Sequence, residues 1–283
     1  MTTRSALPPE AIESAFIDAC LLDVTAMKPG NVGLHGAGHG MHAAQFIRSA
    51  RAAAPEIARP GATVGERIAR AISATHDAVG INTNLGIVLL AAPLAQAALL
   101  PGKTLAEVLV ELTIEDAEHA FAAIRLANPG GLGRSPRHDV HAPARVTLLE
   151  AMREAAPRDR IASQYRDGFV DVLGTGRAAV AAARARDLDW CRTATAVFLA
   201  FLARYTDSHV ERKLGDSQAR TLREAASQAS APQCAQAHDG ALERWDLDLK
   251  SRGVNPGTSA DLTVATLFAS FLEIESGWSA GSG

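Results

Sequence analysis

Apolar residues recur along this chain at the three- and four-residue spacing of amphipathic helices. One such stretch begins after Pro8, where Pro9 and Glu10 suit the first turn of a helix. Its apolar positions are Ile12, Phe16, Ile17, Cys20, Leu21 and Val24. Alternating apolar and polar runs rich in β-branched residues, the pattern of half-buried strands, do not occur in the sequence. The pattern therefore predicts an all-α fold.

Residues that start and stop helices divide the chain further. Asn84 is placed to begin a helix that ends at Leu100. Thr113 is placed as an N-cap, with Asp116 as a capping-box partner, for a helix that ends before Pro129. Further helices are predicted over 144–155, 159–184, 188–206, 216–229, 232–250 and 258–276. Because no linker or repeat separates them, we expect one helical bundle over 1–283, with its core at about 10–276.

The bulk composition narrows the class of protein. The 283 residues carry a net charge of −3 and are 47% hydrophobic, which suits a globular domain with a large core. No basic block is present, so neither nucleic acid nor a membrane surface is expected as a partner. The three cysteines form no disulfide framework, and the N-terminus lacks the apolar core of a signal peptide. We therefore expect a cytoplasmic protein.

The longest apolar run lies between Leu85 and Leu100. Pro93 and Gln96 interrupt it, and it is too short for a convincing membrane span, so it predicts a buried helix. The alanine- and leucine-rich faces of the predicted helices are also compatible with a homodimer, although nothing in the sequence specifies one.

Polar residues and glycines concentrate at five breaks between the predicted helices. The breaks are Ala26–His42 (AMKPGNVGLHGAGHGMH), Gly80–Ile87 (GINTNLGI), Asn128–His141 (NPGGLGRSPRHDVH), Arg204–Ser217 (RYTDSHVERKLGDS) and Val254–Leu262 (VNPGTSADL). Helix N-termini and cationic side chains bind phosphate, and Asp and Asn oxygens suit Mg²⁺. We therefore expect the helix ends to converge on one site for a metal-bound polyphosphate. A single break of this kind, such as NPG or PGG, is more often a turn with a helix cap than a binding site.

The histidines leave other interpretations open. His35, His39 and His42 suggest a zinc site, but the intervening glycines oppose a helix there, and a glycine loop with one or two histidine hydrogen bonds is simpler. Three His-Asp dipeptides leave an all-α metal-dependent phosphohydrolase as an alternative. They are His76-Asp77, His138-Asp139 and His238-Asp239. A non-catalytic nucleotide-binding protein is a third alternative. Walker A, Rossmann and G-x-S-x-G motifs are missing from the sequence.

The five breaks, in this order, resemble the triphosphoribosyl-dephospho-CoA synthase family. The matching segments are KPGNVG (28–33), NTNLG (82–86), GGLGR (130–134), DSHVERKLG (207–215) and NPGTSADL (255–262). The resemblance implies an all-helical enzyme that uses ATP and 3′-dephospho-CoA. In the implied reaction a ribose hydroxyl of the acceptor attacks the anomeric carbon of the ATP ribose, adenine leaves, and the triphosphate stays on the transferred sugar.

The residues of several motifs resemble an archaeal and methylotroph branch of that family more than they resemble its citrate-lyase members. In that branch the acceptor need not be dephospho-CoA, and precursors of one-carbon carriers are an alternative. The resemblance therefore implies ATP as the donor more firmly than it implies the acceptor.

The implied chemistry assigns roles to residues at the breaks. For the triphosphate and the substrate we predict Lys28, Asn31, Thr83, Arg134, Arg212, Lys213, Thr258 and Ser259. For Mg²⁺ we predict the carboxylates Asp207 and Asp261, helped by Asn82, Asn84 and Asn255. Asp116 and Asp139 are the two candidates for the base that accepts the hydroxyl proton. The simpler alternatives are a solvated helix face for Arg212 and Lys213, a first-turn charge for Asp261 and a capping role for Asp116.

Overall fold

The computed structural model describes residues 6–34, 41–229 and 239–276. These residues form helices without any β-strand, so the predicted all-α fold is confirmed. The elements are α1 (Pro9–Thr25), α2 (Ala43–Ile57), α3 (Val64–Val79), α4 (Leu85–Leu99), α5 (Leu105–Val110), α6 (Ile114–Ala127), α7 (Leu148–Ala155), α8 (Arg160–Arg166), the π-helical segment η1 (Asp171–Gly176), α9 (Arg177–Arg184), α10 (Trp190–Arg204), α11 (Ser208–Leu214), α12 (Asp216–Ala229), α13 (Asp239–Ser251) and α14 (Gly257–Ser276).

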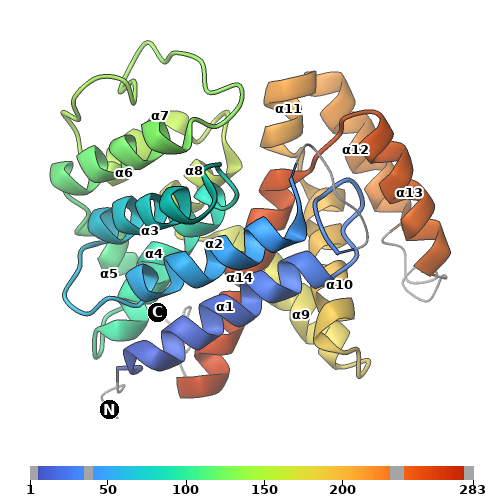
Figure 1. Ribbon diagram of the computed structural model, residues 1–283, viewed down its shortest axis with the longest axis horizontal. Coiled ribbons are helices and arrows are strands. Elements are labelled where there is room, and N and C mark those ends of the chain that lie inside the picture. Colours follow the sequence, from blue (N-terminus) through green and yellow to red (C-terminus); the bar gives the residue numbers. More distant parts are fainter. Residues whose placement is uncertain (1–5, 35–40, 230–238, 277–283) are drawn as a thin grey trace.

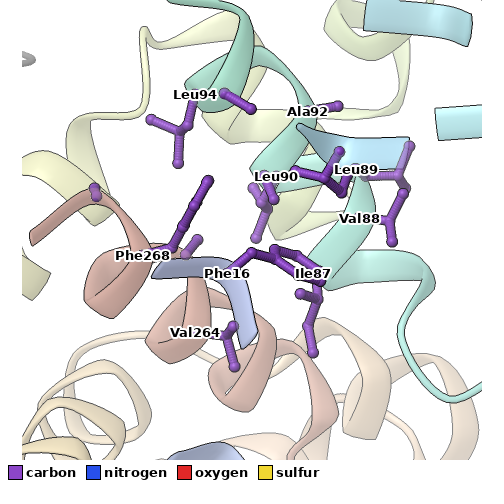
Figure 2. Close-up of a cluster of buried hydrophobic side chains, with 14 of the residues drawn as sticks. Phe16, Ile87, Val88, Leu89, Leu90, Ala92, Leu94, Val264 and Phe268 are labelled. Carbon is purple, nitrogen blue, oxygen red and sulfur yellow. The ribbon is translucent and has the colours of Figure 1, made fainter. Parts of the chain in front are cut away.

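Two apolar helices, α4 and α14, form the centre of the main core. Thirteen of the fifteen residues of α4 are buried, which confirms the buried helix predicted from the long apolar run. Figure 2 shows Phe16 of α1 among side chains of α4 and α14. The rings of Phe16 and Phe268 meet edge to face with centroids 5.8 Å apart. α1 thus packs against both α4 and α14, and the first residues of α4 and α14 belong to two of the predicted site segments.

The helices divide into two groups around α14. In Figure 1 α3, α4, α6 and α7 lie on the left, and α11, α12 and α13 lie on the right. A second apolar cluster joins the right-hand group to α10 and α14. Its buried members are Phe198, Leu199, Leu202, Val210, Ala219, Leu222, Ala226, Leu249, Val254 and Ala260.

Pro93 lies inside α4 without breaking it. A proline has no backbone N–H, so the carbonyl of Leu89, four residues earlier, loses its helical partner. The buried hydroxyl of Tyr165 in α8 donates to this carbonyl at 2.5 Å. The side chain from α8 therefore replaces the missing helical hydrogen bond.

The prediction of one helix over 159–184 is wrong. The chain forms α8, η1 and α9 instead, because Gly168 and Phe169 adopt positive φ angles of 66° and 62°. The side chain of Gln164 spans this break and accepts hydrogen bonds from the backbone N–H groups of Asp171 and Val172, at 3.2 and 3.4 Å. A helical periodicity continues across such a break, so it is not visible in the apolar pattern.

Other helix boundaries differ by a few residues. The helix predicted from 144 starts after Thr147, whose hydroxyl caps α7. The start of the helix predicted over 232–250 lies outside the described residues, and α13 begins at Asp239. None of the helices in the described ranges could span a bilayer. The structure describes one chain, and the homodimer stays a prediction.

Candidate active site

A cavity of about 1010 Å³ lies where helix ends from distant parts of the chain meet. Four of the five glycine-rich breaks line it over 80–86, 128–140, 209–213 and 255–261, together with residues 148–162. The first break contributes Met41. The segments come together because α4, α8, α11 and α14 all begin at this place.

Helix N-termini give the cavity wall a partly positive character. The long helices α4 and α14 present Gly86 and Thr258 from their first turns to the cavity. Free backbone N–H groups and the helix dipole favour anionic oxygens at such places. The wall therefore suits phosphate.

Asp261 is the carboxylate that faces the cavity with the fewest partners. It lies in the second turn of α14, and no hydrogen bond reaches it from the described residues. Burial, followed by the nearby Asp23 and Asp207, raises the pKa of Asp261 well above its ordinary value, while Lys28 lowers it. A Cβ atom at Gly86 would lie 2.1 Å from Asp261 Oδ2, so only glycine at that position leaves room for this carboxylate.

Five cationic side chains surround the cavity. They are Arg134, Arg137, Arg158, Arg212 and Lys213. Arg212 lies 3.3 Å from both the Gly130 carbonyl and Asp159 Oδ2, so it connects α11 to two other walls. Lys213 forms no ion pair with the described residues and packs against Gly130. These cations can therefore bind a polyanion without first losing a buried partner.

The predicted triphosphate ligand Lys28 lies behind the cavity wall. It is 3% exposed, and its ammonium lies 2.5 Å from Asp23 Oδ1 and 2.5 Å from Asn31 Oδ1. Asn31 in turn donates to Asn255 Oδ1 at 2.9 Å. Only Asn255 in this chain of contacts lines the cavity. Burial raises the pKa of Asp23, and Lys28 opposes that shift.

Asp207 and Ser259 also lie behind the wall. Asp207 caps α11 and accepts from the N–H groups of His209, Val210 and Ser259 and from the Ser259 hydroxyl. With four donors on it, this carboxylate offers no free oxygen towards a metal ion. Burial raises its pKa, and these hydrogen bonds lower it. Thr258 lines the cavity, and its hydroxyl oxygen accepts from the backbone N–H of His209.

The two candidates for the base occupy very different places. Asp116 is a capping-box carboxylate between α3 and α6, away from the cavity, and accepts from Gly65 N–H and Thr113 N–H. Burial raises the pKa of Asp116, but the hydrogen bonds outweigh this and hold it below the ordinary value. Asp139 lines the cavity, and hydrogen bonds from the N–H groups of His141 and Ser135 lower its pKa.

The polar residues of the NTNLG segment also differ in whether they line the cavity: Asn82 does, whereas Thr83 and Asn84 do not. Asn82 lines the cavity and its Oδ1 caps α4 through the N–H of Leu85 at 3.1 Å. Thr83 points away and donates to Ser49 at 2.6 Å. Asn84 is buried and donates to Thr75 at 3.0 Å, leaving its Oδ1 without a hydrogen bond among the described residues.

The histidine-based alternatives gain no support from the geometry. His42 precedes α2 as its N-cap, while His35 and His39 lie outside the described residues. His76 and His138 line the cavity, and His238 lies outside the described residues. Within the described ranges, no three His, Cys, Asp or Glu side chains are grouped so that they could hold a metal ion.

Sequence reasoning did not single out several residues that shape the site. Three of them lie outside the quoted breaks: Asp23, Arg158 and Asp159. Two others lie within the breaks but were given no role: Gly86 and Arg137. Asp159 had a local signal, because an Asp two residues before Ile161 is a typical N-cap, and it does accept from Ile161 N–H at 2.9 Å. The others depend on contacts between distant segments, which local patterns do not report.

Comparisons with known proteins agree with this architecture. The sequence matches the family described as ATP:dephospho-CoA triphosphoribosyl transferase over residues 9–280. A crystal structure from Archaeoglobus fulgidus, assigned as a triphosphoribosyl-dephospho-CoA synthase, is 22% identical in sequence with a TM-score of 0.62. The match covers 81% of this chain and 98% of that chain, and at this identity it shows a shared fold. No curated protein matches the sequence. Because the family match spans nearly the whole sequence, the chain belongs to the ATP:dephospho-CoA triphosphoribosyl transferase family.

Proposed function

We propose that the cavity of this transferase holds ATP together with its acceptor, and that the acceptor is 3′-dephospho-CoA. The family's reaction moves the 5-triphosphoribosyl group of ATP to a hydroxyl of dephospho-CoA and releases adenine. One observation carries the proposal: five cations and the N-termini of α4 and α14 converge on one cavity of about 1010 Å³. A space of this size is at the upper end of small-molecule pockets, which suits two substrates better than one.

The chemistry sets three requirements. The bond from the ribose anomeric carbon to adenine breaks while a bond to the acceptor oxygen forms, and the sugar passes through a state with positive charge at that carbon. Anionic groups nearby stabilise this charge, an acid protonates adenine, and a base accepts the hydroxyl proton. Binding of the remote triphosphate supplies the positioning.

The triphosphate is assigned to the cations at the cavity rim. Arg212 and Lys213 reach in from α11, and Arg134 reaches in from the loop between α6 and α7. Arg134 is 3.8 Å from Asp139, and its side chain is 76% exposed, so it can turn towards a ligand at little cost. Charge-assisted hydrogen bonds from arginine to phosphate are among the stronger polar contacts.

Mg²⁺ is assigned to the same place, carried in with the triphosphate. The donor set fits, because Mg²⁺ usually takes one or two protein carboxylates and completes its shell with phosphate and water. Asp261 is a carboxylate on the cavity that accepts no hydrogen bond from the described residues, and Asn82 also lines the cavity. When bound, the ion would neutralise phosphate charge and favour the ionised form of Asp261.

Asp139 is the remaining candidate for the base, since Asp116 does not reach the cavity. Its lowered pKa keeps it ionised at neutral pH, and it is correspondingly a weak base. A weak base suffices if the hydroxyl loses its proton late, after the bond to adenine has stretched. The free thiols of Cys20 and Cys191 are consistent with a reducing compartment, and we place the reaction in the cytoplasm.

The test is mass spectrometry of the products after incubation with ATP, Mg²⁺ and a panel of acceptors. The proposal predicts free adenine and an acceptor heavier by the triphosphoribosyl group, with dephospho-CoA as the best acceptor. Adenine release with a pterin precursor but not with dephospho-CoA would assign another acceptor. Release of ADP, AMP or phosphate without adenine would overturn the proposal in favour of a phosphohydrolase or a kinase.

A further inference from the structure

The KPGN turn that follows α1 is fixed against the segment that precedes α14. The backbone N–H of Gly30 donates to Asp246 Oδ1 of α13 at 2.8 Å. Gly30 has a φ of +83°, and a Cβ atom there would lie 2.8 Å from the carbonyl oxygen of Val254. The turn is therefore packed closely against residues 254–256, and its side chains are placed to act on Asn255.

Hydrogen-bond chemistry fixes how the side chains in this turn are oriented. The Lys28 ammonium can only donate, so the Asn31 atom 2.5 Å from it must be the amide oxygen. The NH₂ group of Asn31 then faces Asn255, and the atom that it meets at 2.9 Å must be the Asn255 oxygen. Asp23, 2.5 Å from Lys28 Nζ and buried with it, holds the ammonium in place.

The orientation of Asn255 follows from this chain. Its oxygen is turned inward to Asn31, while the residue itself lines the cavity and is 9% exposed. No described residue accepts a hydrogen bond from its NH₂ group, and that group is not among the buried polar atoms without a partner. The amide donor therefore faces the cavity.

We propose that Asn255 donates a hydrogen bond to a phosphate oxygen of the ATP triphosphate, and that Asp23, Lys28 and Asn31 are positioning residues that hold its amide in that orientation. Phosphate is favoured over a neutral hydroxyl because Asn255 lies two residues before Gly257, the first residue of α14, and the N-terminus of that helix carries partial positive charge. The proposal rests on the proposed function for the location of ATP. It replaces the prediction that Asn255 offers an oxygen to Mg²⁺.

The variant Asn255→Asp separates a donor from a metal ligand, since it keeps the shape of the side chain but exchanges the NH₂ group for oxygen. We expect the affinity for inorganic triphosphate and for ATP, measured by calorimetry with and without Mg²⁺, to fall by about tenfold or more. Adenosine binding should change much less. Unchanged triphosphate binding, or tighter binding once Mg²⁺ is added, would overturn the proposal.

Asn128→Asp is the matched control for the added negative charge, because Asn128 lines the same cavity and belongs to no part of this chain of contacts. Its loss of triphosphate affinity should be clearly smaller. An equal loss in both variants would mean that charge, rather than a lost donor, explains the result, and would also overturn the proposal.

The positioning residues are tested with Asn31→Asp. A carboxylate there still pairs with Lys28 but can only accept, so the Asn255 amide must turn its NH₂ group inward. We expect weaker triphosphate binding with a melting temperature within a few degrees of the wild type. The double variant Asn31→Asp, Asn255→Asp should bind no more weakly than Asn255→Asp alone. Additive losses in this cycle would show that Asn31 does not act through Asn255.

Failure of the inference can be told apart from failure of the proposed function. Adenine release by the wild-type enzyme tests the reaction alone. Binding of inorganic triphosphate to the wild type and to the Asn255 variant tests the donor alone, whether or not adenine is released.

Discussion

At the scale of single residues, the carboxylates of and near the site differ in how many hydrogen bonds they accept from the protein. Asp207 and Asp116 are each satisfied by several donors. Asp261 faces the cavity, receives no hydrogen bond from the described residues and lies among other carboxylates. Its position costs stability in the absence of ligand, which is common where a group is kept for function.

Asp261→Asn should therefore raise the stability of the unliganded protein while abolishing Mg²⁺-dependent ATP binding and adenine release. A gain of about 1 kcal/mol corresponds to a rise of roughly 2–4 °C in melting temperature for a chain of this size. Thermal unfolding with and without ATP and Mg²⁺ measures both effects. A lower melting temperature with normal binding would instead assign Asp261 a capping role.

The gain in stability caused by Asp261→Asn should increase with pH. The folded-state pKa of Asp261 is raised, so its carboxyl imposes no penalty below the unfolded value of 3.8, and the penalty grows as the pH rises towards the folded value. The difference in melting temperature between Asp261→Asn and the wild type should accordingly increase as the pH rises above 3.8 towards the raised folded-state pKa. A constant or decreasing difference would contradict this origin.

Tyr165→Phe should destabilise the fold because it leaves the Leu89 carbonyl, opposite Pro93, without a partner. An unsatisfied buried carbonyl costs about 1–3 kcal/mol, which denaturant unfolding can resolve. Tyr205→Phe is the matched control. The Tyr205 hydroxyl contacts Thr175 and Arg204 in a partly buried place, where water can substitute, so its removal should cost less.

At the scale of elements, the close approach of α4 and α14 decides the shape of the cavity floor. The approach depends on Gly86 in the first turn of α4. A Cβ atom there would lie 2.1 Å from Asp261 Oδ2 and 2.7 Å from Ile161 Cδ1 of α8. One small residue thus sets the spacing of three helices.

Gly86→Ala should displace Asp261 and reduce the rate of adenine release by at least about tenfold, a loss of about 1.4 kcal/mol in transition-state stabilisation. Gly174→Ala is the control, because a Cβ atom at Gly174 meets nothing within 4 Å. The control should keep its activity and change stability by less than about 1 kcal/mol. Equal activity in the two variants would show that Asp261 has room to move.

At the scale of the whole molecule, charged side chains of both signs are brought together at the cavity. The cations Arg134, Arg137, Arg158, Arg212 and Lys213 line the cavity together with the acidic residues Asp139, Glu154, Asp159, Glu211 and Asp261. Arg212 also joins the loop after α6 to α8 and α11. A polyanion that pairs with these cations therefore binds where both groups of helices in Figure 1 supply residues.

Raising the ionic strength from about 0.05 to 0.3 M should therefore raise the KM for ATP several-fold, since salt screens exposed charges. Lys213→Gln should raise this KM and weaken its dependence on salt. Arg192→Gln, which removes an exposed cation of α10 that does not line the cavity, should do neither. An identical salt dependence in wild type and Lys213→Gln would contradict a role for Lys213 in binding triphosphate.

The site residues were only partly predictable from sequence. The glycine-rich breaks marked the segments that line the cavity, because helix ends and bare backbone leave local signals. Those signals did not say which side chains face inward. Lys28 and Asp207 have the chemistry expected of ligands, but tertiary contacts with Asp23 and Ser259 occupy them. Asp23 itself left no signal, because its partner is defined only by the turn that follows α1.

The sequence by itself determined that this chain is all helical, where helices such as α4, α6, α12 and α14 begin and end, and to which family it belongs. Those properties follow from local periodicity, capping residues and motif order. Only the tertiary structure decided where the helix breaks at Phe169 and that Tyr165 donates a hydrogen bond to the Leu89 carbonyl. It also decided which polar side chains line the cavity and which lie behind its wall. Each of these depends on atoms far apart in the chain being brought within a few ångströms, which periodicity along the chain does not encode.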